Sequence, residues 1–123
     1  MGKAVAEFQN ISPTIAVRNL EKSLSYYTDI LGFKIVFQNP GTFAVLGRDK
    51  VRIGLQSDPE GLRAGKTTCY IWTHLIKDVY IEYMEKKALI IQELHYMESH
   101  KMNDFIVADP DGNTIGIGEI PAG

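Results

Sequence analysis

The same order of predicted elements occurs twice along this chain, and this repeat constrains the fold more than any single motif does. Each half contains a strand, a helix and then three further strands, although the two halves differ in sequence. The candidate caps Asn19 and Asp78 predict the helices, the first of which also has apolar residues at helical spacing, and apolar runs bounded by turn sequences predict the strands. The predicted elements are residues 11–17, 20–31, 33–38, 42–46 and 50–56 in the first half, and 67–75, 78–87, 89–94, 105–108 and 114–120 in the second.

A duplicated βαβββ unit predicts an α+β fold with two curved four-stranded sheets. We expect each sheet to carry its helix on the outer side, so that the inner sides face a shared concavity where a ligand can bind. The chain of 123 residues fits a single domain, with a first module over residues 11–56 and a second over 67–120. Residues 95–103 have the least clear pattern. We expect an irregular polar loop there, with an adaptable lid as the alternative.

Composition excludes several classes of partner. The net charge of −2 and the scattered lysines and glutamates offer no binding surface for nucleic acid or for an anionic membrane. Cys69 is the only cysteine, so there is no internal disulfide, and its position in a predicted strand favours a half-buried thiol over a catalytic nucleophile. The sequence contains no signal peptide and no long apolar run, which predicts a cytoplasmic protein.

Residues 109–113 (Asp-Pro-Asp-Gly-Asn) form a strong turn sequence before the last predicted strand. Asp-Pro begins such a turn, and Asp-Gly supplies the positive φ that it needs. Ile115 and Ile117 then alternate with smaller residues, as in a strand with one packed face and one open face. We therefore assign Asp109 and Asp111 to the turn and not to catalysis.

Two groups of residues, one near each end of the chain, match a known family. They are Ile-Ala-Val-Arg-Asn-Leu at 15–20 with Ser23, Tyr26, Tyr27 and Leu-Gly-Phe at 31–33, and Phe105 with Asp-Pro-Asp-Gly-Asn at 109–113. With them the chain resembles the vicinal oxygen chelate superfamily, which includes glyoxalase I, extradiol dioxygenases, fosfomycin resistance enzymes and the bleomycin resistance proteins. The resemblance covers residues 11–120. It indicates the fold and not the activity, because this scaffold hosts many chemistries.

The resemblance also indicates where a metal site would lie. In metal-dependent members, histidines and glutamates from four strands hold a divalent ion on the inner sheet faces. The matching positions here are Ser12, Gly54, Tyr70 and Gly116. These residues lack the imidazole and carboxylate groups that zinc, nickel, iron or manganese sites need. We therefore expect no metal and no other cofactor.

Strand alternation predicts the residues that line the cleft. The predicted ligand-binding residues are Ser12, Thr14, Arg52, Gly54, Tyr70, Trp72, His74, Thr114 and Gly116. Most are small and leave volume, whereas Tyr70 and Trp72 are either core residues or flat faces for a planar ligand, worth about 0.5–1.5 kcal/mol beyond burial. His74 is a structural hydrogen-bonding residue, a general base or a lone metal ligand. Arg52 either clamps an anionic group or lies at the rim.

These features favour a metal-independent protein that binds a small molecule, a planar antibiotic or metabolite, similar to the bleomycin resistance proteins. No residue is assigned to catalysis. The resemblance further implies a homodimer whose clefts are completed or bordered by the second subunit. The alternative is a glyoxalase-like lyase or isomerase, or a dioxygenase-related enzyme, with a metal held by His74, Glu119 and histidines of the 95–100 segment contributed by the partner subunit. That alternative needs a bulge in the last strand, because Glu119 has the wrong alternation relative to Gly116. A non-catalytic accessory module is a third reading.

Overall fold

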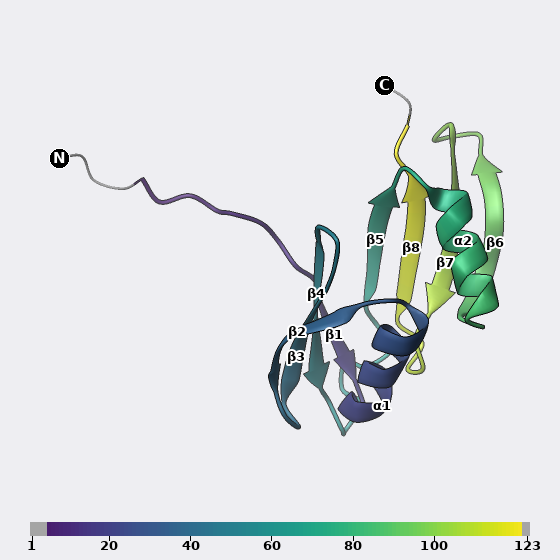
Figure 1. Cartoon of the computed structure of the whole chain (residues 1–123). Coiled ribbons are helices and arrows are strands. Elements are labelled where there is room, and N and C mark those ends of the chain that lie inside the picture. Colours follow the sequence, from purple (N-terminus) through teal and green to yellow (C-terminus); the bar gives the residue numbers. More distant parts are fainter. Residues whose placement is uncertain (1–4, 122–123) are drawn as a thin grey trace.

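The computed structural model describes residues 5–121, and the predicted order of elements occurs in it twice (Figure 1). The first module consists of β1 (Thr14–Val17), α1 (Leu20–Ser25) with the π-helical turn η1 (Tyr26–Ile30), β2 (Lys34–Asn39), β3 (Phe43–Arg48) and β4 (Val51–Ser57). The second module consists of β5 (Thr68–Thr73), α2 (Ile76–Glu85), β6 (Leu89–Met97), β7 (Met102–Ala108) and β8 (Thr114–Glu119). The predicted α+β fold of two βαβββ modules is confirmed.

Each module forms one four-stranded mixed sheet, and the strand pairing relates the two sheets position by position. The strand orders are β1-β4-β3-β2 and β5-β8-β7-β6. β1 runs parallel to β4 with Thr14 opposite Gly54, and β5 runs parallel to β8 with Tyr70 opposite Gly116. Thr14 and Tyr70 are therefore equivalent positions in the two modules, and so are Gly54 and Gly116.

The helices pack on one face of the sheets and join the modules through a common core. The four apolar residues of the first predicted helix are at most 5% exposed, and each contributes about 1.5–3 kcal/mol through burial. They are Leu20, Leu24, Tyr27 and Leu31. Two tyrosines at equivalent helix positions cross between modules: the Tyr27 hydroxyl donates to the Asp109 carboxylate at 2.9 Å, and the Tyr83 hydroxyl donates to the Leu31 carbonyl at 2.8 Å.

One of the two predicted helix caps is confirmed and the other is wrong. The Asn19 side chain accepts a hydrogen bond of 3.0 Å from a backbone N–H in the first turn of α1. α2 begins at Ile76, not behind Asp78, and its N-cap residue Leu75 makes no side-chain cap bond. The Thr73 hydroxyl accepts a hydrogen bond from the Leu75 N–H at 3.1 Å, which turns the chain earlier than predicted. Asp78 lies instead in the first turn, where a carboxylate faces the positive end of the helix dipole.

Two strand predictions also change. The first strand begins at Thr14 and not at residue 11, because Pro13 has no N–H to donate to the ladder. The irregular loop expected over residues 95–103 is wrong, since β6 continues to Met97 and β7 starts at Met102, with a short turn between them. Register shifts at two places in β6 break the alternation that would have marked this strand in the sequence.

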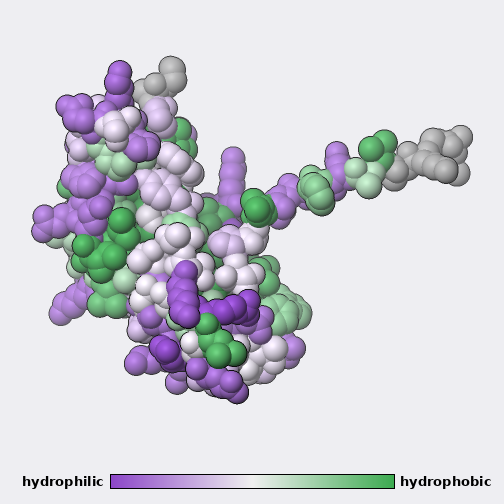
Figure 2. Space-filling model, turned by 180° about the vertical axis from the view of Figure 1, so that it is seen from behind, coloured by the Kyte–Doolittle hydropathy of each residue, from purple (hydrophilic) through white to green (hydrophobic). Residues whose placement is uncertain are grey.

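The segment before β1 extends away from the body of the molecule, as Figures 1 and 2 show. Three of its side chains are apolar and almost fully exposed: Val5 is 86%, Phe8 103% and Ile11 94% exposed. This segment, residues 5–13, is called the arm below. Among residues 5–121, no helix has the length and apolar character needed to cross a membrane.

Candidate functional site

The open face of the first sheet carries a hollow of about 330 Å³. Ser12, Thr14 and Gly54, three of the predicted ligand-binding residues, line it. Phe43 and Val45 of β3 add apolar surface at the same hollow. A Cβ atom added to Gly54 would meet only ordinary contacts, 3.7 Å from the Pro13 carbonyl oxygen and from the Thr14 hydroxyl. The face therefore has free space next to Gly54.

The open face of the second sheet is different, because the Tyr70 ring lies flat over its glycines. A Cβ atom on Gly116 or on Gly118 would collide with this ring. The Tyr70 hydroxyl donates to the Asp104 carboxylate at 2.8 Å, which holds the ring in place. Trp72 follows at a ring-centroid distance of 4.9 Å and is 51% exposed. The result is an aromatic surface with one buried edge and one exposed face.

Asp104 is the centre of a polar cluster that the sequence analysis missed. It is 4% exposed and lies on β7 opposite Gly118. Besides Tyr70, it accepts from Gln92 Nε2 at 3.0 Å and lies 3.0 Å from His95 Nε2. Burial first, and then the hydrogen bond and charge of Asp104, raise the pKa of Tyr70, so this phenol stays neutral. Asp104 was missed because the predicted strand began at Phe105, whereas β7 begins at Met102 and includes Asp104 on its open face.

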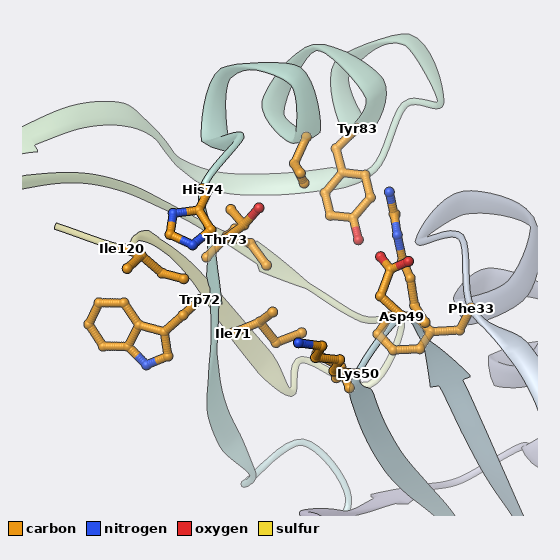
Figure 3. A pocket seen from close by; sticks show the side chains of 13 residues that line it. Phe33, Asp49, Lys50, Ile71, Trp72, Thr73, His74, Tyr83 and Ile120 are labelled. Carbon is orange, nitrogen blue, oxygen red and sulfur yellow. The ribbon is translucent and has the colours of Figure 1, made fainter. Parts of the chain in front are cut away.

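Trp72 and His74 also line a second cavity, which lies between the modules (Figure 3). It encloses about 410 Å³. Its walls come from the β3–β4 hairpin, from the end of β5, from α2 and from β8. We call it the junction cavity.

The remaining predicted site residues make local contacts. The Arg52 guanidinium donates to the carbonyls of Asp49 and Val51 at 3.0 and 2.9 Å, so it is tied to its own hairpin. The Thr114 hydroxyl donates to the Thr68 hydroxyl at 2.8 Å across β8 and β5. Within one chain, the other predicted ligand-binding residues lie at a hollow on the first sheet, at an aromatic face on the second and at the junction cavity.

The residues present do not suit a divalent metal ion. Because Thr14 and Tyr70 are equivalent, the second-module counterpart of Ser12 is Thr68, two residues before Tyr70. Neither hydroxyl is an imidazole or a carboxylate. The Tyr70 ring occupies the space that a glutamate at Gly116 would need. Over residues 5–121, no three His, Cys, Asp or Glu side chains gather as metal ligands would.

The ligand set of the enzyme alternative is likewise dispersed within one chain. Glu119 accepts hydrogen bonds from the Asn103 backbone N–H and side-chain amide at 3.2 and 3.0 Å. His95 faces Asp104, and His100 lies 2.8 Å from the Ser99 hydroxyl. His74 lies apart from both, at the junction cavity.

Comparisons with known proteins agree with this architecture. A model described as Glyoxalase/Bleomycin resistance protein/Dioxygenase superfamily matches residues 9–117. A bleomycin resistance protein of Geobacillus stearothermophilus is 34% identical over 125 aligned positions, covering 84% of this chain and 90% of that protein. The crystal structure of the bleomycin-binding protein from bleomycin-producing Streptomyces verticillus, complexed with copper(II)-bleomycin, has a TM-score of 0.80 at 18% identity and covers 95% of this chain and 100% of its own. A lactoylglutathione lyase from Agrobacterium tumefaciens has a TM-score of 0.75 at 15% identity, covering 93% and 96%. At these low identities the structural matches establish the fold alone.

Proposed function

Because the chain belongs to the glyoxalase/bleomycin resistance protein/dioxygenase superfamily, we propose that it binds a planar antibiotic of the bleomycin type, or a metabolite of similar shape, without transforming it. The ligand class follows the bleomycin resistance protein that is 34% identical to this chain. The observation that carries the proposal is the open face of the second sheet, where Trp72 is exposed beside Tyr70. Aromatic faces of this kind stack on planar ligands and add about 0.5–1.5 kcal/mol beyond burial.

We also propose that binding needs no metal ion. The support is the Tyr70 ring, which covers Gly116 and Gly118 and is held by the buried Asp104 carboxylate. A protein that used a carboxylate ligand at this position would need room there for its Cβ atom. Here the room is filled by a neutral aromatic ring, which suits stacking and not coordination.

A homodimer is the third part of the proposal. The hollow of the first sheet and the aromatic face of the second are lined by separate residues, and we infer that a second copy brings the two kinds of surface together around one ligand. The arm supports this view, because Val5, Phe8 and Ile11 expose apolar surface along an extended segment that leads directly to Ser12 at the hollow. Apolar surface of this kind is commonly covered by a partner. The lone Cys69 is consistent with a cytoplasmic location.

Calorimetric titration of the chelator-treated protein with metal-free bleomycin tests binding and metal independence together. We expect saturable binding with one ligand per chain. Trp72→Ala should weaken it about tenfold, because stacking and its buried area are lost. Tyr96→Ala is the matched control, since Tyr96 is 54% exposed and pairs with Asn103 on the other face of the same sheet. Absence of saturable binding would contradict the ligand assignment, and binding that returns only with added nickel or zinc would contradict metal independence.

Light scattering tests the dimer separately. The wild-type protein should have twice the mass of one chain, and the double variant Phe8→Asp, Ile11→Asp should be monomeric, because charged side chains cannot be buried at an apolar interface. Leu62→Asp is the control, as Leu62 is 69% exposed on the loop between the modules. A monomeric wild-type protein would contradict the dimer and leave the ligand assignment to be judged on the titration.

A further inference from the structure

The junction cavity is lined by apolar side chains that are only partly buried by the core. Val51 of β4, Ile71 of β5 and Val79 of α2 are each half-buried, whereas Ile117 of β8 behind them is buried. The volume of about 410 Å³ falls within the range of roughly 300–1000 Å³ that is typical of small-molecule pockets. Binding of a hydrocarbon group that displaces water from this apolar surface is favourable.

The equivalent place at the other end of the molecule is filled, so the duplicated fold does not itself require a cavity. When the two modules are aligned by strand register and by the first residue of each helix, Val51 is equivalent to Asn113 and Val79 to Ser23. Asn113 is 0% and Ser23 1% exposed, and the Asn113 amide donates two hydrogen bonds of 2.9 Å. Valine at both positions removes these polar contacts and lines the space with methyl groups.

The mouth of the cavity carries one available positive charge. Figure 3 shows the Lys50 side chain reaching toward Ile71. Within residues 5–121, Lys50 takes part in no ion pair. His74 lies on the same cavity and adds a second positive charge only when it is protonated.

Arg48, the other lysine or arginine that lines the cavity, already has a partner. Arg48 donates to both carboxylate oxygens of Glu82 at 2.7 and 2.8 Å and to the Leu31 carbonyl at 3.0 Å. Hydrogen bonding to Glu82 is the largest cause that raises the pKa of Arg48, and the charge of Asp49 adds to it. In Figure 3 the Asp49 carboxylate points toward Tyr83 and away from Lys50. Lys50 is therefore the cation that remains for a ligand.

We propose that the junction cavity, which shares Trp72 with the open face of the second sheet, is a second binding site, for a small amphipathic carboxylate. The hydrocarbon part lies against Val51, Ile71 and Val79, and the carboxylate pairs with the Lys50 ammonium. One cation above an apolar floor favours a monoanion with a short tail over a neutral molecule of the same length. It also disfavours a small anion without a tail, which would leave the floor in contact with water.

Octanoate and 1-octanol are the probes, because they share a tail and differ in charge. Methyl resonances of Val51, Ile71 and Val79 are followed by NMR during each titration of the wild-type protein. We expect both probes to shift these methyls saturably, with octanoate binding more tightly. Lys50→Glu should weaken octanoate about five- to tenfold and leave 1-octanol unchanged, as expected for one surface charge reversed. Lys22→Glu, on the exposed side of α1, is the matched control and should change neither.

A second variant tests the location. Val79→Phe fills the cavity and should abolish the shifts from both probes, while the remaining spectrum shows that the fold is intact. The proposal is overturned if octanoate leaves the cavity methyls unmoved, if Lys50→Glu weakens both probes equally or neither, or if Val79→Phe binds as the wild type does. No bleomycin is present in these titrations, so their failure and a failure of antibiotic binding are independent results.

Discussion

The two junctions between the modules occupy equivalent places in the duplicated fold, but one is sealed by buried polar groups and the other is open. At the sealed junction, the Asp109 carboxylate is 2% exposed and accepts four hydrogen bonds of 2.9 Å. At the open junction, the Tyr83 hydroxyl donates to a backbone carbonyl, and the nearby Arg48–Glu82 ion pair stays 29% and 34% exposed. Next to that pair lies a cavity of about 410 Å³.

The difference teaches that the repeat fixes the backbone and leaves the side chains free to diverge. The sealed junction uses the turn over residues 109–113 as a structural joint, with each polar group satisfied. The open faces diverge in the same manner: the first sheet has free space at Gly54, whereas Tyr70 covers Gly116 in the second. Equivalent positions of the two modules thus carry different side chains and make different contacts.

The largest effect is expected from removing the carboxylate that seals the first junction. Asp109→Ala leaves the buried Tyr27 hydroxyl and one N–H of the Asn113 side-chain amide without an acceptor, and it frees two backbone N–H groups of the turn. We expect the free energy of unfolding to fall by about 3–4 kcal/mol, measured by urea denaturation.

Asp49→Asn is the control, because Asp49 lies in the equivalent hairpin at the open junction, is exposed, and has a positive φ of 51° that asparagine adopts readily. It should change stability by less than about 0.5 kcal/mol. Equal losses at the two positions would show that the junctions do not differ in the way their contacts indicate.

The second largest effect concerns the equivalent glycines of the open faces. Gly116→Ala places a Cβ atom against the Tyr70 ring, so the ring must move and its bond to Asp104 is lost. We expect a loss of about 2–3 kcal/mol by urea denaturation, together with changed fluorescence of Trp72, whose ring contacts Tyr70. Gly54→Ala should be tolerated, since its Cβ would lie 3.7 Å or more from its neighbours. A well-tolerated Gly116→Ala would mean that the ring is not fixed.

The sequence predicted the repeat, the fold and the sealing turn, because each depends on local patterns. Each of these patterns involves residues that are close in the sequence: the cap Asn19, the helical spacing of Leu20 and Leu24, and the turn over residues 109–113. The Asp104 cluster and the open junction could not be predicted, because they depend on which residues face each other across long separations. His95 meets Asp104 through two register shifts of β6, and no periodic signal survives such shifts.

The two equivalent tyrosines should also titrate differently. Burial raises the pKa of both, and the charge of Asp109 raises that of Tyr27 further, whereas the charge of Arg48 opposes the shift of Tyr83, whose pKa is about 12. Because this value exceeds the ordinary one near 10, the neutral Tyr83 phenol stabilises the fold fully below about pH 10, and this stabilisation is lost between about pH 10 and 12. Between about pH 10 and 12 the free energy of unfolding should decrease in the wild type, and Tyr83→Phe should lack roughly 2 kcal/mol of this decrease. In a pH titration followed by tyrosinate absorbance, the step near pH 12 should be absent in Tyr83→Phe and present in Tyr27→Phe. The opposite result would mean that the tyrosine of the open junction has the more strongly raised pKa.

The smallest effect is expected at the ion pair of the open junction. Glu82→Gln removes the charge opposite Arg48 but keeps a side chain of similar size, and both partners are already about one third exposed. Ion pairs in contact with water contribute about 0.5–1 kcal/mol, and salt screens them, so the loss should shrink when urea denaturation is repeated at high salt. A loss above about 2 kcal/mol that salt does not reduce would instead mean that the open junction is also held by a buried polar contact. A small, salt-sensitive loss means that the modules are held together mainly at Asp109, and that the residues around the junction cavity can adjust to a ligand at little cost in stability.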